Sequence, residues 1–344
     1  MKRFVLIFIL IVSTINLEAF KKHTPEEIIT STADALSVCK PLRYKNLTIF
    51  PLALSKGRDT KSIITLDEAI NRNYINIKET ESGDVNTVVL INTSKYYVFL
   101  LSGEIITGCK QDRMVGEDCL IPPHSGKVYL HVYCTEHGRW TKKSERFSGG
   151  LMAISPNMRK VAKTSESQSE VWDQVEEKRE EIGATASPTS RYMDIVQDKK
   201  IAGKLNSYID KFSNIPDIKN RNVVGAVAAV GDEIIVLDIF TNHRLFKKLW
   251  SKLIKSYALD AIHKTVYGKL SRRDVYNFIK NLNDAELTER KTDGVGKSFT
   301  INNENSFGTS LIFKNKITHL DLFPEVTSHP KGRIPILDFR RKTQ

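Results

Sequence analysis

Residues 100–140 read LLSGEIITGCKQDRMVGEDCLIPPHSGKVYLHVYCTEHGRW, and this stretch alternates short apolar runs with dense polar clusters. Apolar runs of this length, bounded by Gly, Pro and polar residues, are typical of short β-strands. The polar clusters fall where the runs end, at residues 102–104 (SGE), 110–113 (KQDR) and 136–140 (EHGRW). No other part of the sequence gathers so many acids, bases and anion-binding groups at strand ends, so we expect the functional site here.

The strand pattern extends outward from this stretch over residues 44–150. Val85–Ile91 and Tyr96–Leu101 predict one hairpin, and Met114–Ile121 and Lys127–Cys134 predict a second. Short antiparallel strands in this number indicate a sandwich-like or barrel-like layer.

The rest of the chain is predicted to be helical and then mixed. Residues 144–165 are rich in Gly and Ser and show weak periodicity, so they predict a connector. The elements expected after it are helices over residues 166–182, 191–212 and 243–263, a hairpin over 222–240 around Gly231-Asp232, a short helix opened by Ser271, and three strands within 299–323. We therefore expect an α+β fold with an antiparallel strand-rich N-terminal half, a helical middle and a mixed strand/helix C-terminal part.

The N-terminal residues are predicted to be a signal peptide, over residues 1–19. Lys2 and Arg3 precede the apolar run Phe4–Val12, and Ala19 supplies a small residue at the cleavage point. The alternative is a membrane anchor, but the run is well short of the ~20 residues that span a bilayer. We expect an exported protein, periplasmic or secreted, with no stable membrane span after cleavage.

The domain organisation follows from these patterns. Residues 20–43 are expected to form an N-terminal helical extension, residues 44–323 a single domain, and residues 324–344 a flexible tail. The chain of 344 residues is long enough to bury a sizeable core.

The cysteines are interpreted in the light of export. There are four, Cys39, Cys109, Cys119 and Cys134. Cys109 and Cys119 flank one short loop and are the pair expected to form a disulfide in an oxidising compartment. The alternative is four buried thiols. We expect no metal site, because no CxxC or His/Cys pair has zinc-ligand spacing.

The charge is strongly basic, with a formal net charge of +12. A solvated surface is the default explanation, and a patch for anionic ligands is the alternative. Nucleic acid is not expected as a partner, because the basic residues are not interleaved with aromatic residues.

Two glutamates are candidates for acid–base chemistry. Glu104 and Glu136 each lie where a predicted strand meets a loop, and a carboxylate there can act as a general base. The alternative is that each accepts structural hydrogen bonds.

The same stretch offers groups that recognise anions. Arg113 and Arg139 provide planar forks, Lys110 a point charge and Gln111 a donor and an acceptor. Trp140 is either a stacking plate or a core residue. Ion pairing with neighbouring acids would remove these groups from ligand binding.

One acid lies outside the stretch and has a different expectation. Asp238 sits among apolar neighbours in a predicted strand, and we expect it to be paired with a Lys or Arg. The sequence has no Gly-rich phosphate loop, no G-x-S-x-G elbow and no HExxH, so no cofactor and no enzyme class is indicated.

Nine motifs follow one another along the chain: YKNLTIFPL (44–52), LDEA (66–69), FLLSGE (99–104), KQDR (110–113), CTEHGRW (134–140), SEVW (169–172), VLDIF (236–240), LIKSYALDA (253–261) and THLDLF (318–323). This ordered set resembles one known family, the domain associated with ADP-ribosylglycohydrolases (ARG) and rhodanese-phosphatases. The resemblance implies an α+β domain with a place in the metabolism of ADP-ribose or related nucleotides. At Asp112 this sequence departs from the Asn that is usual in the family.

Two hypotheses for function remain open. In the first, the exported domain binds, and perhaps processes, a small anionic or sugar-phosphate ligand such as a nucleotide or an ADP-ribose derivative. In the second, it is a non-catalytic envelope interaction or binding module. The first requires Glu104, Arg113, Glu136 and Arg139 to converge on an accessible pocket with a charge unpaired, and the second requires them to be ion-paired and covered.

Overall fold

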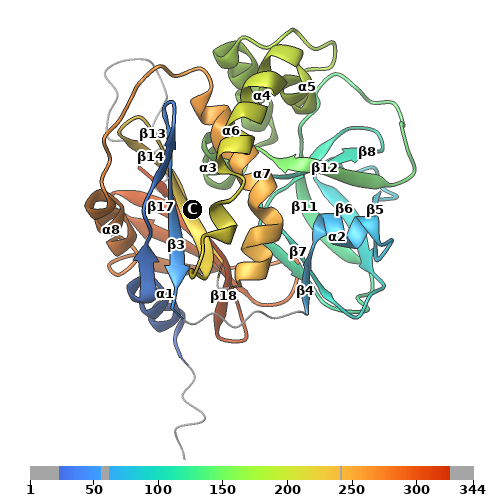
Figure 1. The fold of residues 1–344 in the computed structure, drawn as a ribbon. Coiled ribbons are helices and arrows are strands. Elements are labelled where there is room, and N and C mark those ends of the chain that lie inside the picture. Colours follow the sequence, from blue (N-terminus) through green and yellow to red (C-terminus); the bar gives the residue numbers. More distant parts are fainter. Residues whose placement is uncertain (1–22, 56–61, 241, 326–344) are drawn as a thin grey trace, which may run out of the picture.

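The computed structural model describes residues 23–55, 62–240 and 242–325 (Figure 1). The predicted signal peptide and most of the predicted tail lie outside these residues. The described fold is α+β, as predicted, and its sheets are almost entirely antiparallel. The helices are α1 (Pro25–Ala35), α2 (Leu66–Asn71), α3 (Pro156–Ser165), α4 (Gln168–Ile182), α5 (Tyr192–Gln197), α6 (Lys199–Phe212), α7 (His243–Ala261) and α8 (Arg272–Lys280).

A nine-stranded antiparallel sheet forms the centre of the molecule, in the order β1-β3-β13-β14-β18-β17-β16-β15 with β2 beside β3. Its strands are β1 (Leu36–Val38), β2 (Leu42–Tyr44), β3 (Leu47–Leu54), β13 (Val223–Val230), β14 (Glu233–Ile239), β15 (Glu286–Arg290), β16 (Lys297–Asn303), β17 (Ser306–Phe313) and β18 (Lys316–Pro324). The sheet joins the first strands of the chain to the last, and it contains the predicted hairpin β13–β14.

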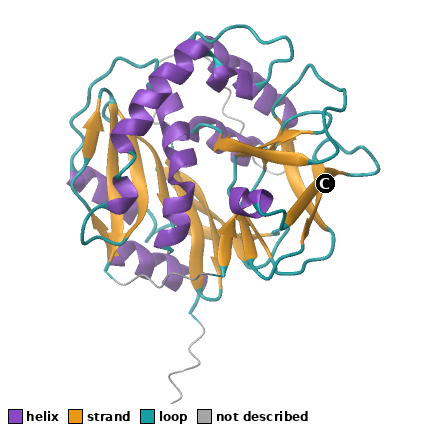
Figure 2. Ribbon diagram, turned by 45° about the vertical axis from the view of Figure 1, so that its right-hand side comes forward, coloured by secondary structure: helices purple, strands orange, loops and turns teal. Residues whose placement is uncertain are grey.

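Helices cover both faces of this sheet. Figure 1 shows α7 running through the middle of the molecule, and Figure 2 shows the helices gathered over the sheet. Phe246 and Leu253 of α7 belong to the core on one face, whereas Ile29 of α1 and Phe278 of α8 belong to the core on the other. Burial on both faces explains why β13 reads VVGAVAAV without polar alternation, since successive side chains point to opposite faces.

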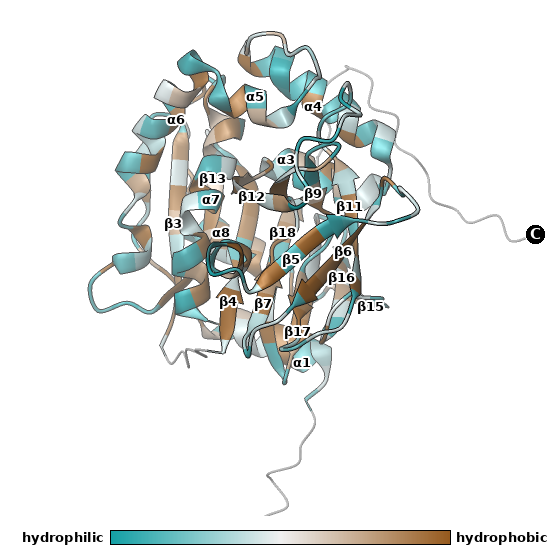
Figure 3. Ribbon diagram, turned by 90° about the vertical axis from the view of Figure 1, so that its right-hand side faces the viewer, coloured by the Kyte–Doolittle hydropathy of each residue, from teal (hydrophilic) through white to brown (hydrophobic). Residues whose placement is uncertain are grey.

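Two smaller sheets carry the stretch at residues 100–140. A three-stranded sheet, β10-β7-β4, contains β4 (Ile63–Thr65), β7 (Tyr97–Leu100) and β10 (Cys119–Ile121). A six-stranded sheet, β12-β8-β9-β11-β6-β5, contains β5 (Ile75–Glu79), β6 (Thr87–Asn92), β8 (Glu104–Gly108), β9 (Arg113–Val115), β11 (Val128–Cys134) and β12 (Phe147–Ala153). Figure 3 shows apolar residues along these strands and along the central sheet, with more polar residues on the outer helices.

The first predicted hairpin is wrong. β6 pairs with β5 and β11, whereas β7 pairs with β4 and β10. The reason is the turn between them: the Asn92 side-chain amide donates to the carbonyl oxygens of Tyr96 and Pro122, both at 2.8 Å. An Asn side chain that satisfies backbone groups in this way replaces a ladder and directs β7 to another sheet.

The second predicted hairpin holds only in part. β11 pairs with β9 over three residues, but β10 leaves to pair with β7. The predicted connector at 144–165 is also wrong, because it forms β12 and α3. The periodicity of this segment is weak because the charged residues Arg159 and Lys163 take buried positions of α3, where they find partners inside the protein.

The described residues of the predicted N-terminal extension pack against the central sheet. β1 pairs with β3, and Ile28 and Ile29 of α1 lie in the core. Thr24 and Glu27 form a capping box at the start of α1. Among the helices the structure describes, none is long and apolar enough to cross a membrane.

Candidate functional site

The KQDR and EHGRW segments meet because their strands are neighbours. In the ladder between β9 and β11, Arg113 is opposite Cys134, so the residues before β9 and after β11 leave the sheet at the same end. The Thr135 backbone N–H donates to the Asp112 carbonyl oxygen at 3.0 Å and extends the pairing by one step. The two loops therefore lie together at one end of the sheet, as the sequence analysis expected.

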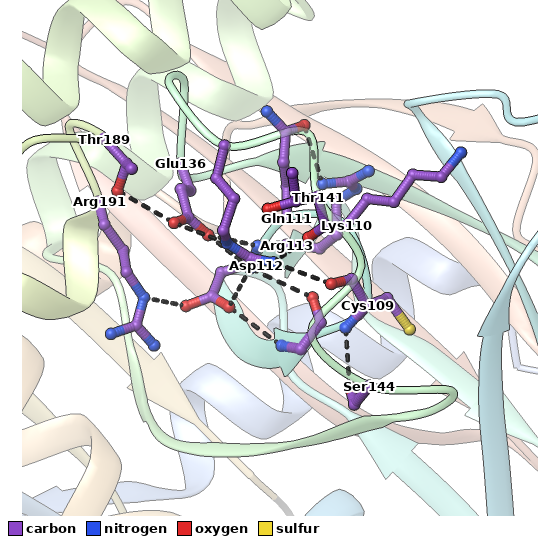
Figure 4. Close-up of polar contacts among 12 residues, drawn as sticks. Cys109, Lys110, Gln111, Asp112, Arg113, Glu136, Thr141, Ser144, Thr189 and Arg191 are labelled. Carbon is purple, nitrogen blue, oxygen red and sulfur yellow. Dashed lines mark hydrogen bonds and ion pairs between the residues drawn. The ribbon is translucent and has the colours of Figure 1, made fainter.

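Four side chains form the arginine–carboxylate cluster at this point: Asp112, Glu136, Arg139 and Arg191 (Figure 4). Arg139 donates from Nε and Nη2 to the two oxygens of Glu136, at 3.0 and 2.7 Å. Arg191 donates from Nε to Asp112 at 2.6 Å. Bidentate and charge-assisted contacts of this kind are the strongest hydrogen bonds in proteins.

The remaining donors of Arg139 are also occupied. Its Nη1 donates to the carbonyl oxygens of Cys109 and Thr141, at 2.8 and 2.9 Å. Arg139 therefore connects the loop that contains Cys109 with its own loop, which contains Thr141. A guanidinium group that is used in this way has little capacity left for a ligand.

Glu136 accepts more bonds than its Arg139 contacts. The Asp112 backbone N–H donates to it at 3.2 Å and Thr189 Oγ1 donates at 3.0 Å. Burial alone would raise the pKa of Glu136, but these bonds, led by those from Arg139, hold the pKa below its usual range. Glu136 is therefore a weak proton acceptor at neutral pH.

Arg113 and Gln111 lie beside the cluster. Arg113 is 1% exposed, its Nη1 donates to Gln111 Oε1 at 3.2 Å, and its Nη2 lies 3.7 Å from Glu79 Oε1. Gln111 Nε2 donates to the His137 carbonyl oxygen at 3.3 Å. Both predicted ligand-binding groups are buried and engaged with the protein.

Lys110 and Trp140 form the exposed rim of the site. Lys110 Nζ lies 4.9 Å from the centre of the Trp140 ring, within the range of a cation–π contact. Trp140 is 50% exposed. This is an open aromatic plate with a cation over it, held by a loop that Arg139 fixes in place.

Glu104 lies apart from the other predicted residues. Glu104 is the first residue of β8, and the cluster lies at the other end of this strand, where the Gly108 backbone N–H donates to Asp112. Four residue steps of ~3.3 Å separate Glu104 from Gly108 by roughly 13 Å. Glu104 instead contacts Lys252 of α7, which also lies 2.8 Å from Asp67. Burial raises the pKa of Glu104, and the Lys252 ammonium opposes this effect only in part.

The predicted disulfide is not formed. Cys39, Cys109, Cys119 and Cys134 are all free thiols. The short sequence separation of Cys109 and Cys119 misled the prediction, because the intervening residues cross between sheets: Cys109 follows β8 in one sheet and Cys119 begins β10 in another. The alternative of buried thiols describes the structure.

A second charged group lies in the core, where sequence analysis placed only Asp238. The expectation that Asp238 is paired is confirmed: Arg159 of α3 donates to both of its oxygens at 2.9 Å. His319 of β18 bridges Asp238 and Asp118, at 3.0 and 2.6 Å, and Lys163 contacts Asp321 at 2.5 Å. We call the six residues Asp118, Arg159, Lys163, Asp238, His319 and Asp321 the buried charge network.

The opposite charges in the buried charge network shift the pKa values of its members. Burial alone would lower the pKa of His319, but the carboxylates of Asp118 and Asp238 raise it to about 9. Burial alone would raise the pKa of Asp118, but His319, the Lys163 ammonium and the Ser102 backbone N–H together lower it to about 2. Donor atoms of Asp238, His319 and Asp321 lie within 4.8 Å of one another, yet Arg159 and Lys163 already neutralise them, so a metal ion would face two cations.

The family of the chain is settled by a comparison with sequence profiles. The profile of the ARG and Rhodanese-Phosphatase-superfamily-associated Protein domain, ARPP-1, matches residues 35–323. The chain belongs to the ARPP-1 domain family. The search of curated proteins finds no match, and neither does the search of solved structures.

The ARPP-1 match covers every candidate residue described above. It begins close to β1 and ends in β18, so it spans the cluster, Glu104 and the buried charge network. Arg191, Thr189 and Glu79 were missed by sequence analysis. They lie far from KQDR and EHGRW in the chain and carry no motif that points to them.

Proposed function

We propose that this ARPP-1 domain is an exported, non-catalytic binding domain for a small anionic ligand such as a nucleotide or an ADP-ribose derivative. In this proposal Trp140 stacks on a base or sugar face and Lys110 contacts a phosphate. The observation that carries it is the geometry of the rim, with Lys110 Nζ 4.9 Å from an indole ring that is 50% exposed.

The absence of catalysis in the proposal follows from how the acids are engaged. Glu136 accepts four hydrogen bonds, and Glu104 is fully buried beside Lys252. A general base must reach the proton it abstracts and must be free to accept it. The cluster instead serves to hold the loop of Lys110 and Trp140.

The experiment is a titration of the purified protein with ADP-ribose, ADP and a sugar phosphate. Binding is measured by tryptophan fluorescence and by calorimetry. Trp140→Ala and Lys110→Ala are expected to weaken binding roughly tenfold or more, as loss of a stacking or charged contact does. Lys142→Ala is the matched control, because Lys142 is an exposed lysine of the same loop that pairs with Glu145 instead of Trp140.

The competing function is an envelope interaction module, which the covered, ion-paired state of Glu136 and Arg139 also fits. The exposed Trp140 would then contact a protein. Failure of all three ligands to bind would contradict our proposal and leave this function in its place.

Export is the second part of the proposal and rests on the sequence of residues 1–19. Fractionation of expressing cells, with N-terminal sequencing of the product, tests it. A product that retains Met1 in the cytoplasm would contradict it.

A further inference from the structure

A cationic cavity of about 430 Å³ shares no lining residue with the arginine–carboxylate cluster, with Lys110 and Trp140, or with the buried charge network. It is bounded by the end of β1, the loop between the short 3₁₀ helix Ile215–Asp217 and β13, and the first turns of α8. Its size is within the range of cavities that hold small ligands.

Three cations from three separate segments line this cavity: Lys40, Arg221 and Arg272. None of its lining residues is Asp or Glu. Within residues 23–55, 62–240 and 242–325, none of the three side chains forms an ion pair. Like charges brought together without a counter-charge repel one another, so the site favours an anion.

The pKa of the Cys39 thiol also reflects the positive charge of the cavity. Burial raises the pKa of the Cys39 thiol, and the guanidinium groups of Arg221 and Arg272 act against that rise. Cys39 and both arginines line this one cavity, although they come from three separate segments of the chain.

The cavity also has an aromatic wall with a fixed position. The Val38 backbone N–H donates to Tyr276 Oη at 3.2 Å, which ties α8 to β1. Tyr276 is 41% exposed, so part of its ring remains open to a ligand. Arg272 is the first residue of α8, so the positive end of the helix dipole adds to the charge of the cavity.

We propose that this cavity is a binding site for a small organic phosphate. A phosphate monoester carries a charge of about −1.5 to −2 at neutral pH and matches the fork of an arginine, whereas a carboxylate carries one charge. The site is separate from Lys110 and Trp140, and the proposal does not rest on the function proposed for them.

The test is calorimetric titration of the full chain with phenyl phosphate, benzoate and inorganic phosphate. Phenyl phosphate is expected to bind at least roughly tenfold more tightly than benzoate, since the arginines can pair with more than one phosphate oxygen. Arg221→Gln and Arg272→Gln are each expected to weaken phenyl phosphate binding roughly tenfold, and Arg273→Gln, beside the cavity but outside its lining, by less than about twofold. Phenyl phosphate should also slow the alkylation of Cys39, followed by mass spectrometry.

Three outcomes would overturn the inference: no binding of phenyl phosphate, equal binding of benzoate, or unchanged affinity in both arginine variants. Loss of phenyl phosphate binding in Trp140→Ala, with Cys39 still unprotected, would place the anion at the rim and also overturn it. Because both arginines are exposed, the variants are expected to fold, and circular dichroism checks that they do.

Discussion

The arginines of the arginine–carboxylate cluster and those of the cationic cavity differ in what faces them. Arg139 and Arg191 each contact a carboxylate, at 2.7 and 2.6 Å, whereas Arg221 and Arg272 line a cavity that contains no acid. The cluster has the more conspicuous sequence motifs, but its charges neutralise one another. Pairing, and not the number of cations in a motif, distinguishes an arginine that holds the fold from one that is available to a ligand.

The largest expected effect is on the stability of the buried charge network, where each acidic side chain has a cationic partner. Arg159→Met leaves Asp238 buried without its main partner, and we expect a loss of about 3–5 kcal/mol in the free energy of unfolding. Urea denaturation measures it. Lys160→Met is the matched control, since Lys160 lies next to Arg159 but contacts Glu325 near the surface and should cost no more than about 1 kcal/mol. Equal losses in the two variants would contradict a structural role for the network.

A smaller effect is expected from pH, through His319. Its pKa in the folded protein is about 9, above the ordinary value of 6.5, so its contribution to stability is fully present below pH 6.5 and is lost as the pH rises through 9. The free energy of unfolding should fall over this range by on the order of 3 kcal/mol.

The control for this prediction is a pair of histidine variants. In His319→Asn the pH dependence between 6.5 and 9 should flatten, whereas in His124→Asn, at an exposed turn, it should stay as in the parent protein. A parent protein whose stability does not change over this range would show that His319 is neutral when folded.

The smallest expected effect concerns the cavity without ligand. Arg221→Gln and Arg272→Gln remove one of three mutually repelling charges, so we expect the free energy of unfolding to stay within about 0.5 kcal/mol of the parent or to rise slightly. Thermal and urea unfolding in low salt measure this. A clear loss of stability would mean that the arginine has a partner that holds the fold.

Local sequence signals predicted several of the helices and one hairpin. Capping boxes at Thr24, Thr65 and Ser271 each begin a helix, and Gly231-Asp232 forms the turn between β13 and β14. The helix expected over residues 191–212 is divided in two, because Asp198 caps the start of α6. These features depend on neighbours in the chain, which is why the sequence reveals them.

The buried charges were missed for the opposite reason. The bonds between Arg159 and Asp238 join residues that are 79 positions apart, and α3, which carries Arg159, was expected to be a connector. The bond between Arg191 and Asp112 spans the same separation. Sequence analysis expected the two motif loops to form one site, but it had no means of finding a partner from a distant helix.

The central claim is that Arg139 supports the fold whereas Lys110 contacts the ligand, and one paired measurement tests it. Arg139→Met and Lys110→Met are compared by urea unfolding and by titration with ADP-ribose. We predict that Arg139→Met loses about 1–3 kcal/mol of unfolding free energy, since it leaves Glu136 without its main partner, while Lys110→Met keeps the parent stability and loses ADP-ribose binding. An Arg139→Met protein with parent stability and abolished binding, beside a Lys110→Met protein that binds normally, would contradict the account.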